Sequence, residues 1–69
     1  MRENALIGIA NRALTAKRVD DAIAYLQLNV SYFPKSAATY TALARAHEAK
    51  GDKAAADKDL AMAKQVGTN

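Results

Sequence analysis

Apolar residues recur at three- and four-residue spacing in four stretches of the chain, and no stretch alternates strictly as a half-buried strand does. The first stretch predicts an amphipathic helix over about residues 4–16. Its apolar positions are Ala5, Leu6, Ile9, Ala10 and Ala13. The other stretches share this spacing, with inner positions at Ala22, Ile23, Leu26 and Val30, at Tyr40, Leu43, Ala44 and His47, and at Ala56, Leu60 and Ala63.

The residues between these stretches are typical of helix boundaries. Pro34 should end the second helix, because proline disfavours helical backbone at the residue before it. Ser36 can cap the start of the third helix, and Gly51 can end it in the left-handed conformation. Asp52 is then the expected N-cap of the fourth helix, and Gly67 its end. Helices joined by such short turns must lie antiparallel to their neighbours.

The chain repeats its pattern of large and small apolar residues after 34 positions. Few of the matched residues are identical, but the size classes stay in register over both helices of each half. The matched pairs include Leu6 with Tyr40, Ile9 with Leu43, Ala10 with Ala44, Ala22 with Ala56, and Leu26 with Leu60.

In this register the chain resembles the tetratricopeptide repeat (TPR) family, whose unit is a helical hairpin of 34 residues. The second unit, about residues 37–69, matches the family at Tyr40, Leu43, Ala44, His47, Gly51, Asp52, Ala56, Leu60 and Ala63. The first unit, about residues 3–36, matches it at Leu6, Ile9, Ala10, Ala13, Ala22, Leu26 and Pro34. The resemblance implies one all-α domain over residues 1–69: two stacked TPR helix-turn-helix hairpins that begin a right-handed superhelix.

Three positions depart from the TPR pattern. Lys17 replaces the turn glycine of the first unit, Asn29 replaces a late small residue, and Thr68 stands where a final proline would be. The alternative to the TPR interpretation is an unrelated, alanine-rich four-helix bundle.

The run LNVSYFPKSAATY at residues 28–40 is also similar to TPR-type tails that follow serine-hydrolase and β-lactamase-like domains. That second resemblance implies a context rather than an activity. It favours an accessory C-terminal segment of a larger protein.

The second helices of the two units differ on the side where a following repeat would pack. Ile23 and Val30 occupy that side in the first unit, and Asp57 and Lys64 occupy the equivalent places in the second. Terminal repeats of a solenoid need a polar outer side. We therefore expect the second unit to be the C-terminal end of the stack.

The first helix is expected to need a neighbour. Ile7 and Leu14 lie beside its main apolar stripe, and a chain of two repeats alone should leave them largely exposed. This predicts an upstream domain or a second copy on that face, with packing against the third helix as the alternative. Tyr25, Tyr32 and Phe33 are expected to fill the corner between the repeats, or else to help dock a partner domain.

The TPR resemblance also implies a possible concave peptide groove on the first helix of each unit. Its candidate residues are Asn4, Ile7, Asn11, Thr41, Arg45 and Glu48. The carboxylate clamp of the family is not supported, because Ile7 and Ala42 stand where its lysine and asparagine would be. Asn11 and Arg45 could still bind a backbone group or a carboxylate.

Composition excludes several other classes of protein. The chain has 69 residues, no cysteine and one histidine, which argues against a disulfide framework and a structural zinc site. Its net charge is +3, but lysine and aspartate alternate between residues 50 and 59, as on a solvated helix face rather than a nucleic-acid-binding stripe. Neither a membrane-spanning run nor a signal peptide is recognisable, so a cytoplasmic location is the default expectation.

No arrangement of residues predicts catalysis. His47 is the one histidine and is expected to pack in the core or at its edge, away from any nucleophile. Asp57 and Asp59 should point to different sides of their helix, and Asp20 and Asp21 suit the start of a helix. We therefore expect a non-catalytic, cofactor-free module that binds a protein or peptide and either self-associates or belongs to a larger protein.

Overall fold

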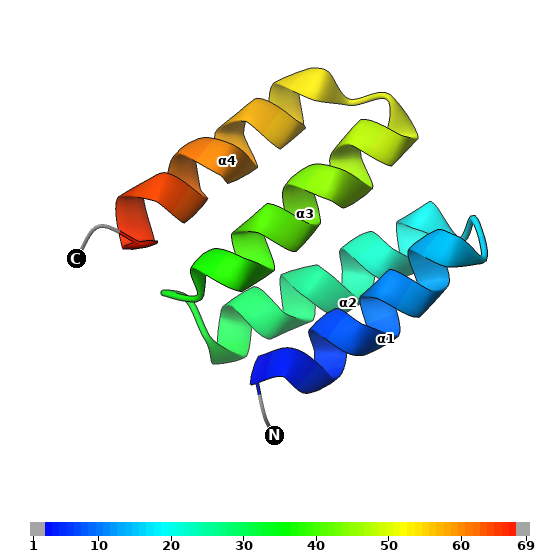
Figure 1. The fold of residues 1–69 in the computed structure, drawn as a ribbon, viewed down its shortest axis with the longest axis horizontal. Coiled ribbons are helices and arrows are strands. Elements are labelled where there is room, and N and C mark those ends of the chain that lie inside the picture. Colours follow the sequence, from blue (N-terminus) through cyan, green and yellow to red (C-terminus); the bar gives the residue numbers. More distant parts are fainter. Residues whose placement is uncertain (1–2, 68–69) are drawn as a thin grey trace.

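The computed structural model describes residues 3–67, which form four helices in the order α1 (Glu3–Thr15), α2 (Val19–Tyr32), α3 (Ala37–Lys50) and α4 (Lys53–Gly67). Successive helices run antiparallel, so the fold is all-α and consists of two helical hairpins, α1–α2 and α3–α4 (Figure 1). The predicted fold class is confirmed. The departure noted at Thr68 lies outside the described residues.

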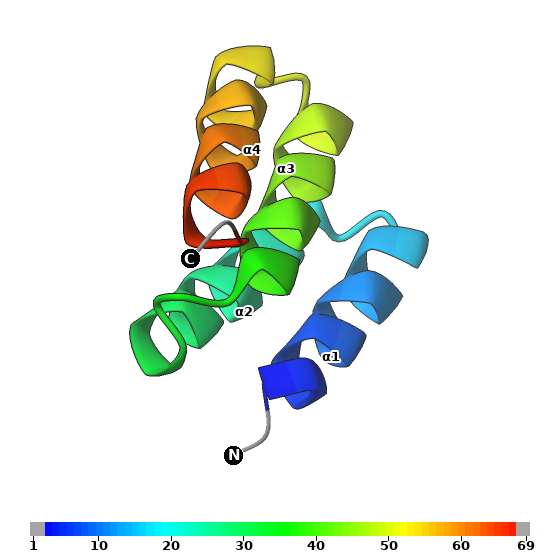
Figure 2. The same ribbon diagram turned by 60° about the vertical axis from the view of Figure 1, so that its left-hand side comes forward.

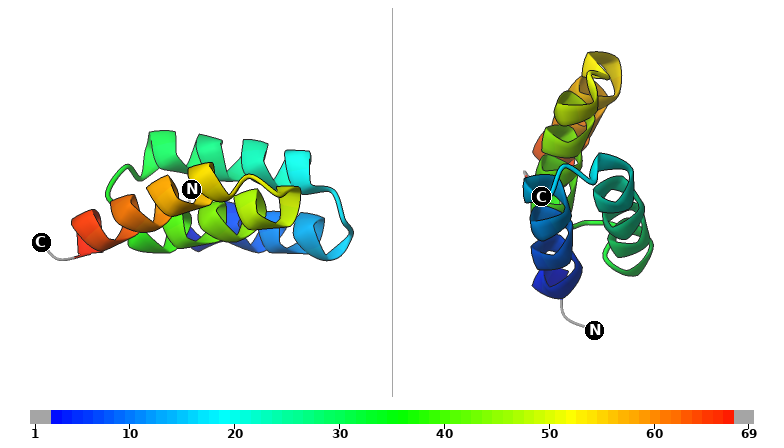
Figure 3. Two further views of the ribbon diagram at one scale, coloured as in Figure 1. Left: turned by 90° about the horizontal axis from the view of Figure 1, so that it is seen from above. Right: turned by 90° about the vertical axis from the view of Figure 1, so that its right-hand side faces the viewer.

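The second hairpin stacks on the first through one helix. Helix α3 packs against both α1 and α2, whereas α4 packs against α3 and against neither helix of the first hairpin. Figure 2 shows α3 beside the α1–α2 pair, and the end-on view of Figure 3 shows α4 on the far side of α3. Among the described helices, the contacts of α3 with α1 and α2 therefore hold the two hairpins together.

Small residues at equivalent positions let the helices come close. Ala10 and Ala22 are fully buried in the first hairpin, and Ala44 and Ala56 are 1% exposed in the second. An alanine side chain adds little width to a helix, so larger core residues such as Leu26 can fill the remaining space at interior density. The alanines that repeat after 34 positions are thus buried in both hairpins.

The two hairpin turns use the same geometry with different residues. In each turn a backbone N–H donates to the carbonyl five residues before it, at 2.8 Å. The residue before that N–H is left-handed: Lys17 has a φ of 63° and Gly51 a φ of 90°. Glycine adopts this conformation without steric cost, whereas a lysine side chain crowds the backbone there. The predicted stop at Gly51 is confirmed, and Lys17 makes the equivalent turn despite its side chain.

Two side-chain caps begin the helices of the second hairpin. The Oγ of Ser36 accepts a hydrogen bond from the backbone N–H of Thr39 at 3.2 Å. Oδ1 of Asp52 accepts one from the N–H of Ala55 at 3.1 Å. Both caps agree with the prediction, and Pro34 follows the end of α2 as expected.

Candidate functional site

Large apolar side chains remain exposed on the first hairpin. Ile9 on α1 is 42% exposed, and on α2 Tyr25, Leu28 and Tyr32 are 39%, 44% and 55% exposed. Positions 25, 28 and 32 are three and four residues apart, so these three side chains lie along one side of α2. We call the four residues the outer face.

The outer face lies away from the second hairpin. Ile7 and Leu14 on α1, together with Ile23 and Val30 on α2, are half-buried against the core, and we call these four the stacking face. Ile9 follows Ile7 by two residues, which turns its side chain about 200° around the helix. The same step separates Tyr25 from Ile23. The outer face therefore lies on the side of the α1–α2 pair that is away from α3. No described helix covers that side (Figure 1).

Two expectations for the first helix are wrong. Ile7 and Leu14 are half-buried against the core rather than largely exposed, which was the alternative for these residues. Ile9, expected on the inner stripe, is the exposed one. The buried side of α1 is centred on Leu6 and Ala10, and the second hairpin extends this burial to the flank with Ile7 and Leu14. Spacing alone does not say which flank of a stripe a neighbour covers.

The last helix ends the stack with a more polar surface. Asp57 and Lys64 are exposed as expected, and Leu60 between them is 46% exposed; we call these three residues the end face. The prediction that Leu60 belongs to the inner stripe is wrong. Its equivalent Leu26 is fully buried because α2 packs against both α1 and α3, whereas α4 has α3 alone.

The six predicted groove residues do not share one environment. Four of them are exposed on α1 and α3: Asn4, Asn11, Arg45 and Glu48. Ile7 belongs to the stacking face, and Oγ1 of Thr41 donates a hydrogen bond to the carbonyl of Ala37 within α3. Asn11 and Arg45 stand at equivalent positions of two helices in contact and remain available for polar binding.

A buried polar cluster that the sequence did not reveal joins three helices. Asn29 on α2 is fully buried, and its Nδ2 donates to the carbonyl of Glu3 at 2.9 Å and to Oγ1 of Thr39 at 2.8 Å. The Thr39 hydroxyl donates to Oγ of Ser36 at 2.8 Å, and the Ser36 hydroxyl donates to the Glu3 carboxylate. The one available signal was the departure at Asn29, where an amide replaces a small residue.

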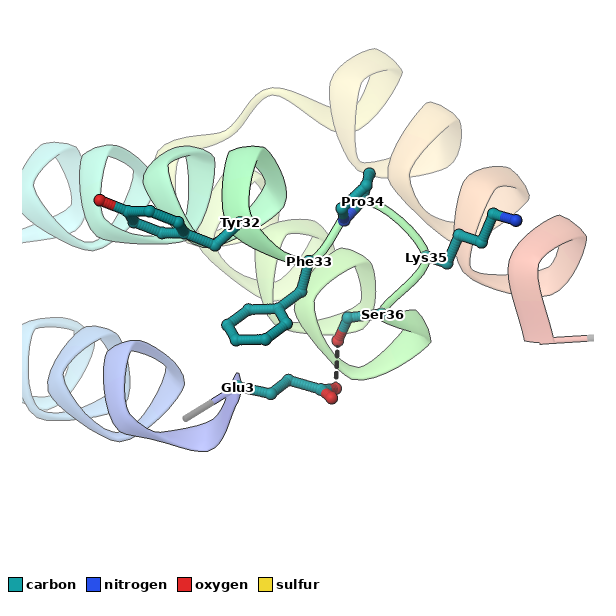
Figure 4. Close-up of a pocket in the computed structure, with 6 residues that line it drawn as sticks. All are labelled: Glu3, Tyr32, Phe33, Pro34, Lys35 and Ser36. Atoms are coloured by element: carbon teal, nitrogen blue, oxygen red, sulfur yellow. Dashed lines mark hydrogen bonds between the residues drawn. The ribbon is translucent and has the colours of Figure 1, made fainter. Parts of the chain in front are cut away.

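An open pocket of about 400 Å³ lies beside this cluster, at the turn from α2 to α3. Its lining residues are Glu3, Tyr32, Phe33, Pro34, Lys35 and Ser36. Figure 4 shows the Phe33 ring reaching toward Glu3, next to the hydrogen bond between Glu3 and Ser36. Of the aromatic residues predicted to fill the corner between the hairpins, Phe33 is half-buried, but Tyr25 and Tyr32 are exposed.

His47 joins the two helices of the second hairpin. It is half-buried on α3, as expected, and its Nδ1 lies 2.5 Å from Oδ2 of Asp59 on α4. Asp57 is exposed, so the two aspartates do point to different sides. Ser36 and Thr39 belong to the buried cluster near the other end of α3, more than about 10 Å along the helix from His47. The pair of His47 and Asp59 therefore has neither of these hydroxyls beside it.

Over residues 3–67, no group of three or more histidine, aspartate and glutamate side chains could hold a metal ion. No helix within the same range combines the length and the apolar character needed to cross a membrane.

Comparisons with protein-family models, with curated proteins and with solved structures found no match to this chain.

Proposed function

We propose that this chain is a pair of tetratricopeptide-type repeats that acts by non-catalytic protein–protein association. The observation that carries the proposal is the contrast between the two ends of the stack. One end presents the four large apolar side chains of the outer face, and the other presents Asp57 and Lys64 around a single leucine. The first end is suited to contact with another protein, and the second is suited to water.

The register of 34 residues supports the assignment to tetratricopeptide-type repeats. The small residues at which the family's helices approach closely, Ala10 and Ala22 with their equivalents Ala44 and Ala56, are all at most 1% exposed. The turns at Lys17 and Gly51 are equivalent in both position and hydrogen bonding. An unrelated bundle needs neither correspondence.

The chemistry of the outer face supports association. Covering exposed apolar surface is favourable by about 25 cal/mol per Å². Tyrosine is also among the residues that contribute most at protein interfaces. The outer face combines Tyr25 and Tyr32 with two aliphatic side chains, whereas the terminal side of a free-standing solenoid is normally polar.

Two contexts would place a protein on this face. The resemblance of residues 28–40 to tails behind serine-hydrolase-like domains favours an upstream domain of a larger protein. Self-association of the repeat pair is the other context. In both contexts, the outer face would form the contact with a partner that the sequence predicted for Ile7 and Leu14.

The peptide groove is the alternative function, and the exposure of Asn11 and Arg45 favours it. It lacks two of its six predicted members, because Ile7 packs in the stacking face and the Thr41 hydroxyl bonds within its own helix. If the groove binds the partner, Arg45→Glu with Asn11→Ala should abolish capture. If the outer face binds it, that pair of changes should have little effect.

Site-specific photo-crosslinking in cells that express the chain tests the proposal. A photoreactive phenylalanine is placed in turn at three exposed positions, Tyr25, Arg45 and Leu60, which sample the outer face, the groove and the end face. We expect protein adducts from position 25 and few from position 60. Adducts from position 45 alone would favour the groove, and an absence of adducts from all three would overturn the proposal.

A further inference from the structure

We infer that the outer face is covered by a second copy of this chain, in a two-fold dimer that places α1 of each copy against α2 of the other. The inference rests on the proposed function and adds the identity of the occupant and its geometry.

A second copy has few apolar surfaces left to offer. Its stacking face is already occupied by its own α3. Its end face would bring Asp57 and Lys64 into the contact, and burying charges without partners is costly. The outer face is then the apolar surface that both copies can contribute. Contact of a surface with itself is the isologous arrangement of two-fold dimers.

The hairpin geometry sets which residues would meet. The hydrogen bond from Asn29 to the carbonyl of Glu3 places these two residues at the same height on α2 and α1. With a rise of about 1.5 Å per residue in antiparallel directions, Ile9 and Tyr25 differ in height by about 3 Å. A two-fold axis along the hairpin preserves heights and places α1 of one copy opposite α2 of the other. Ile9 then faces Tyr25 of the second copy, and the reverse contact forms as well.

Two opposite charges beside the outer face agree with this arrangement. Arg12 lies one turn after Ile9 on α1, and Asp21 lies one turn before Tyr25 on α2, both exposed. By the same rise they differ in height by about 1.5 Å. Among the described residues Arg12 makes no ion pair, and Asp21 pairs with exposed Arg18, the residue that precedes its own helix. The two-fold brings each Arg12 to Asp21 of the second copy.

The size of the face predicts a weak dimer. It spans two helices of 13 and 14 residues, each about 20 Å long. One such face on each copy would bury about 1,000–1,200 Å² in total, at the low end of specific interfaces. The surface of one chain is 4562 Å², so most of each copy stays in water. Dimerisation should therefore depend on concentration.

Sedimentation equilibrium over micromolar to millimolar concentrations tests the inference. The unmodified chain should rise in mass from monomer toward dimer and no further. Ile9→Asp with Leu28→Asp should stay monomeric throughout with its helical circular dichroism retained, because both side chains are more than 40% exposed. The matched control is Leu60→Asp with Met62→Asp, at 46% and 37% exposure on α4, and it should dimerise as the unmodified chain does.

A charge exchange tests the geometry independently of the apolar contacts. Arg12→Asp alone and Asp21→Arg alone should each weaken dimerisation about two- to tenfold at low salt, since each repels across the two-fold axis. The two changes together should restore it.

The remaining outcomes distinguish a failure of the dimer from a failure of the proposed function. An unmodified chain that stays monomeric, or a dimer that survives Ile9→Asp with Leu28→Asp, would overturn the inference. Growth beyond a dimer would also overturn it, because it indicates head-to-tail stacking. If the adduct at position 25 then contains a different protein, the proposed function stands without the dimer; if no position gives an adduct, the proposed function fails too.

Discussion

Helices α2 and α4 differ on the side where a following hairpin would pack, although both have a leucine there in the same register. On α2 the leucine is Leu26, flanked by Ile23 and Val30, and it is fully buried under α3. On α4 it is Leu60, flanked by Asp57 and Lys64, and it is 46% exposed. A further hairpin on α4 would have to bury Asp57 and Lys64, whereas α2 offers Ile23 and Val30 to α3.

Truncating the two leucines should give the largest difference. Leu26→Ala is expected to lower the free energy of unfolding by about 2–5 kcal/mol, whereas Leu60→Ala should change it by about 0.5 kcal/mol. The first opens a cavity in the core, and the second removes surface that is already half in water. Urea denaturation monitored by circular dichroism measures both.

Leu26→Ala could leave the chain largely unfolded, since a core of this size contributes about 3–5 kcal/mol. The milder Leu26→Met keeps the volume and should cost less than about 1.5 kcal/mol. Equal losses from truncation at positions 26 and 60 would show that the burial difference between the two leucines is not real.

The next largest effect is expected at the buried cluster around Asn29, whose equivalent on α4 is Ala63. Asn29→Ala removes two hydrogen bonds that connect α2 to α1 and α3, and should cost about 1–2 kcal/mol. Ser31→Ala, on the exposed side of the same helix, is the control and should cost almost nothing. Combining Asn29→Ala with Thr39→Ala should cost less than the sum of the two single changes. Strict additivity would contradict a cluster that acts as a unit.

The two hairpin turns should respond in opposite directions. Lys17→Gly should stabilise the chain by about 0.5–1 kcal/mol, because it removes the crowding of a left-handed lysine. Gly51→Ala should destabilise it by about 1 kcal/mol. A Cβ at Gly51 would meet no neighbouring atom within 4 Å, so the loss of stability would come from the backbone conformation alone. Thermal melting detects both shifts, and the same sign for both would refute the equivalence of the turns.

Converting the end face into a stacking face should change stability least. Asp57→Ile with Lys64→Val alters two exposed positions and should shift the free energy of unfolding by no more than about 0.5 kcal/mol. It should nevertheless cause growth beyond a dimer, because the altered end can now accept the outer face of another copy head to tail. Light scattering follows this growth. A variant with the mass distribution of the unmodified chain would mean that the charges do not terminate the stack.

Features encoded by neighbouring residues were predictable from the sequence. The helix limits, the caps at Ser36 and Asp52, and the stop at Gly51 each depend on a few consecutive residues, and the structure has them all. The antiparallel order follows from the short turns. The size pattern at 34 residues also identified four alanines that are at most 1% exposed, Ala10, Ala22, Ala44 and Ala56.

Features set by the relative rotation of helices were not predictable. Periodicity placed Ile7 and Ile9 near the same apolar stripe, but the position of α3 decides that Ile7 is covered and Ile9 is not. Leu60 was misplaced because its pattern does not show that α4 packs against α3 alone. The bonds of Asn29 to Glu3 and of His47 to Asp59 join residues 26 and 12 positions apart, which no local pattern specifies.

We propose that in solution the outer face of the stack is covered and the end face is not. Hydroxyl-radical footprinting of the unmodified chain, at concentrations below and above dimerisation, tests it most directly. We expect Ile9, Tyr25, Leu28 and Tyr32 to lose reactivity as concentration rises, while Leu60 and Met62 keep theirs. Protection of Leu60 and Met62, or unchanged reactivity at all six residues, would contradict it.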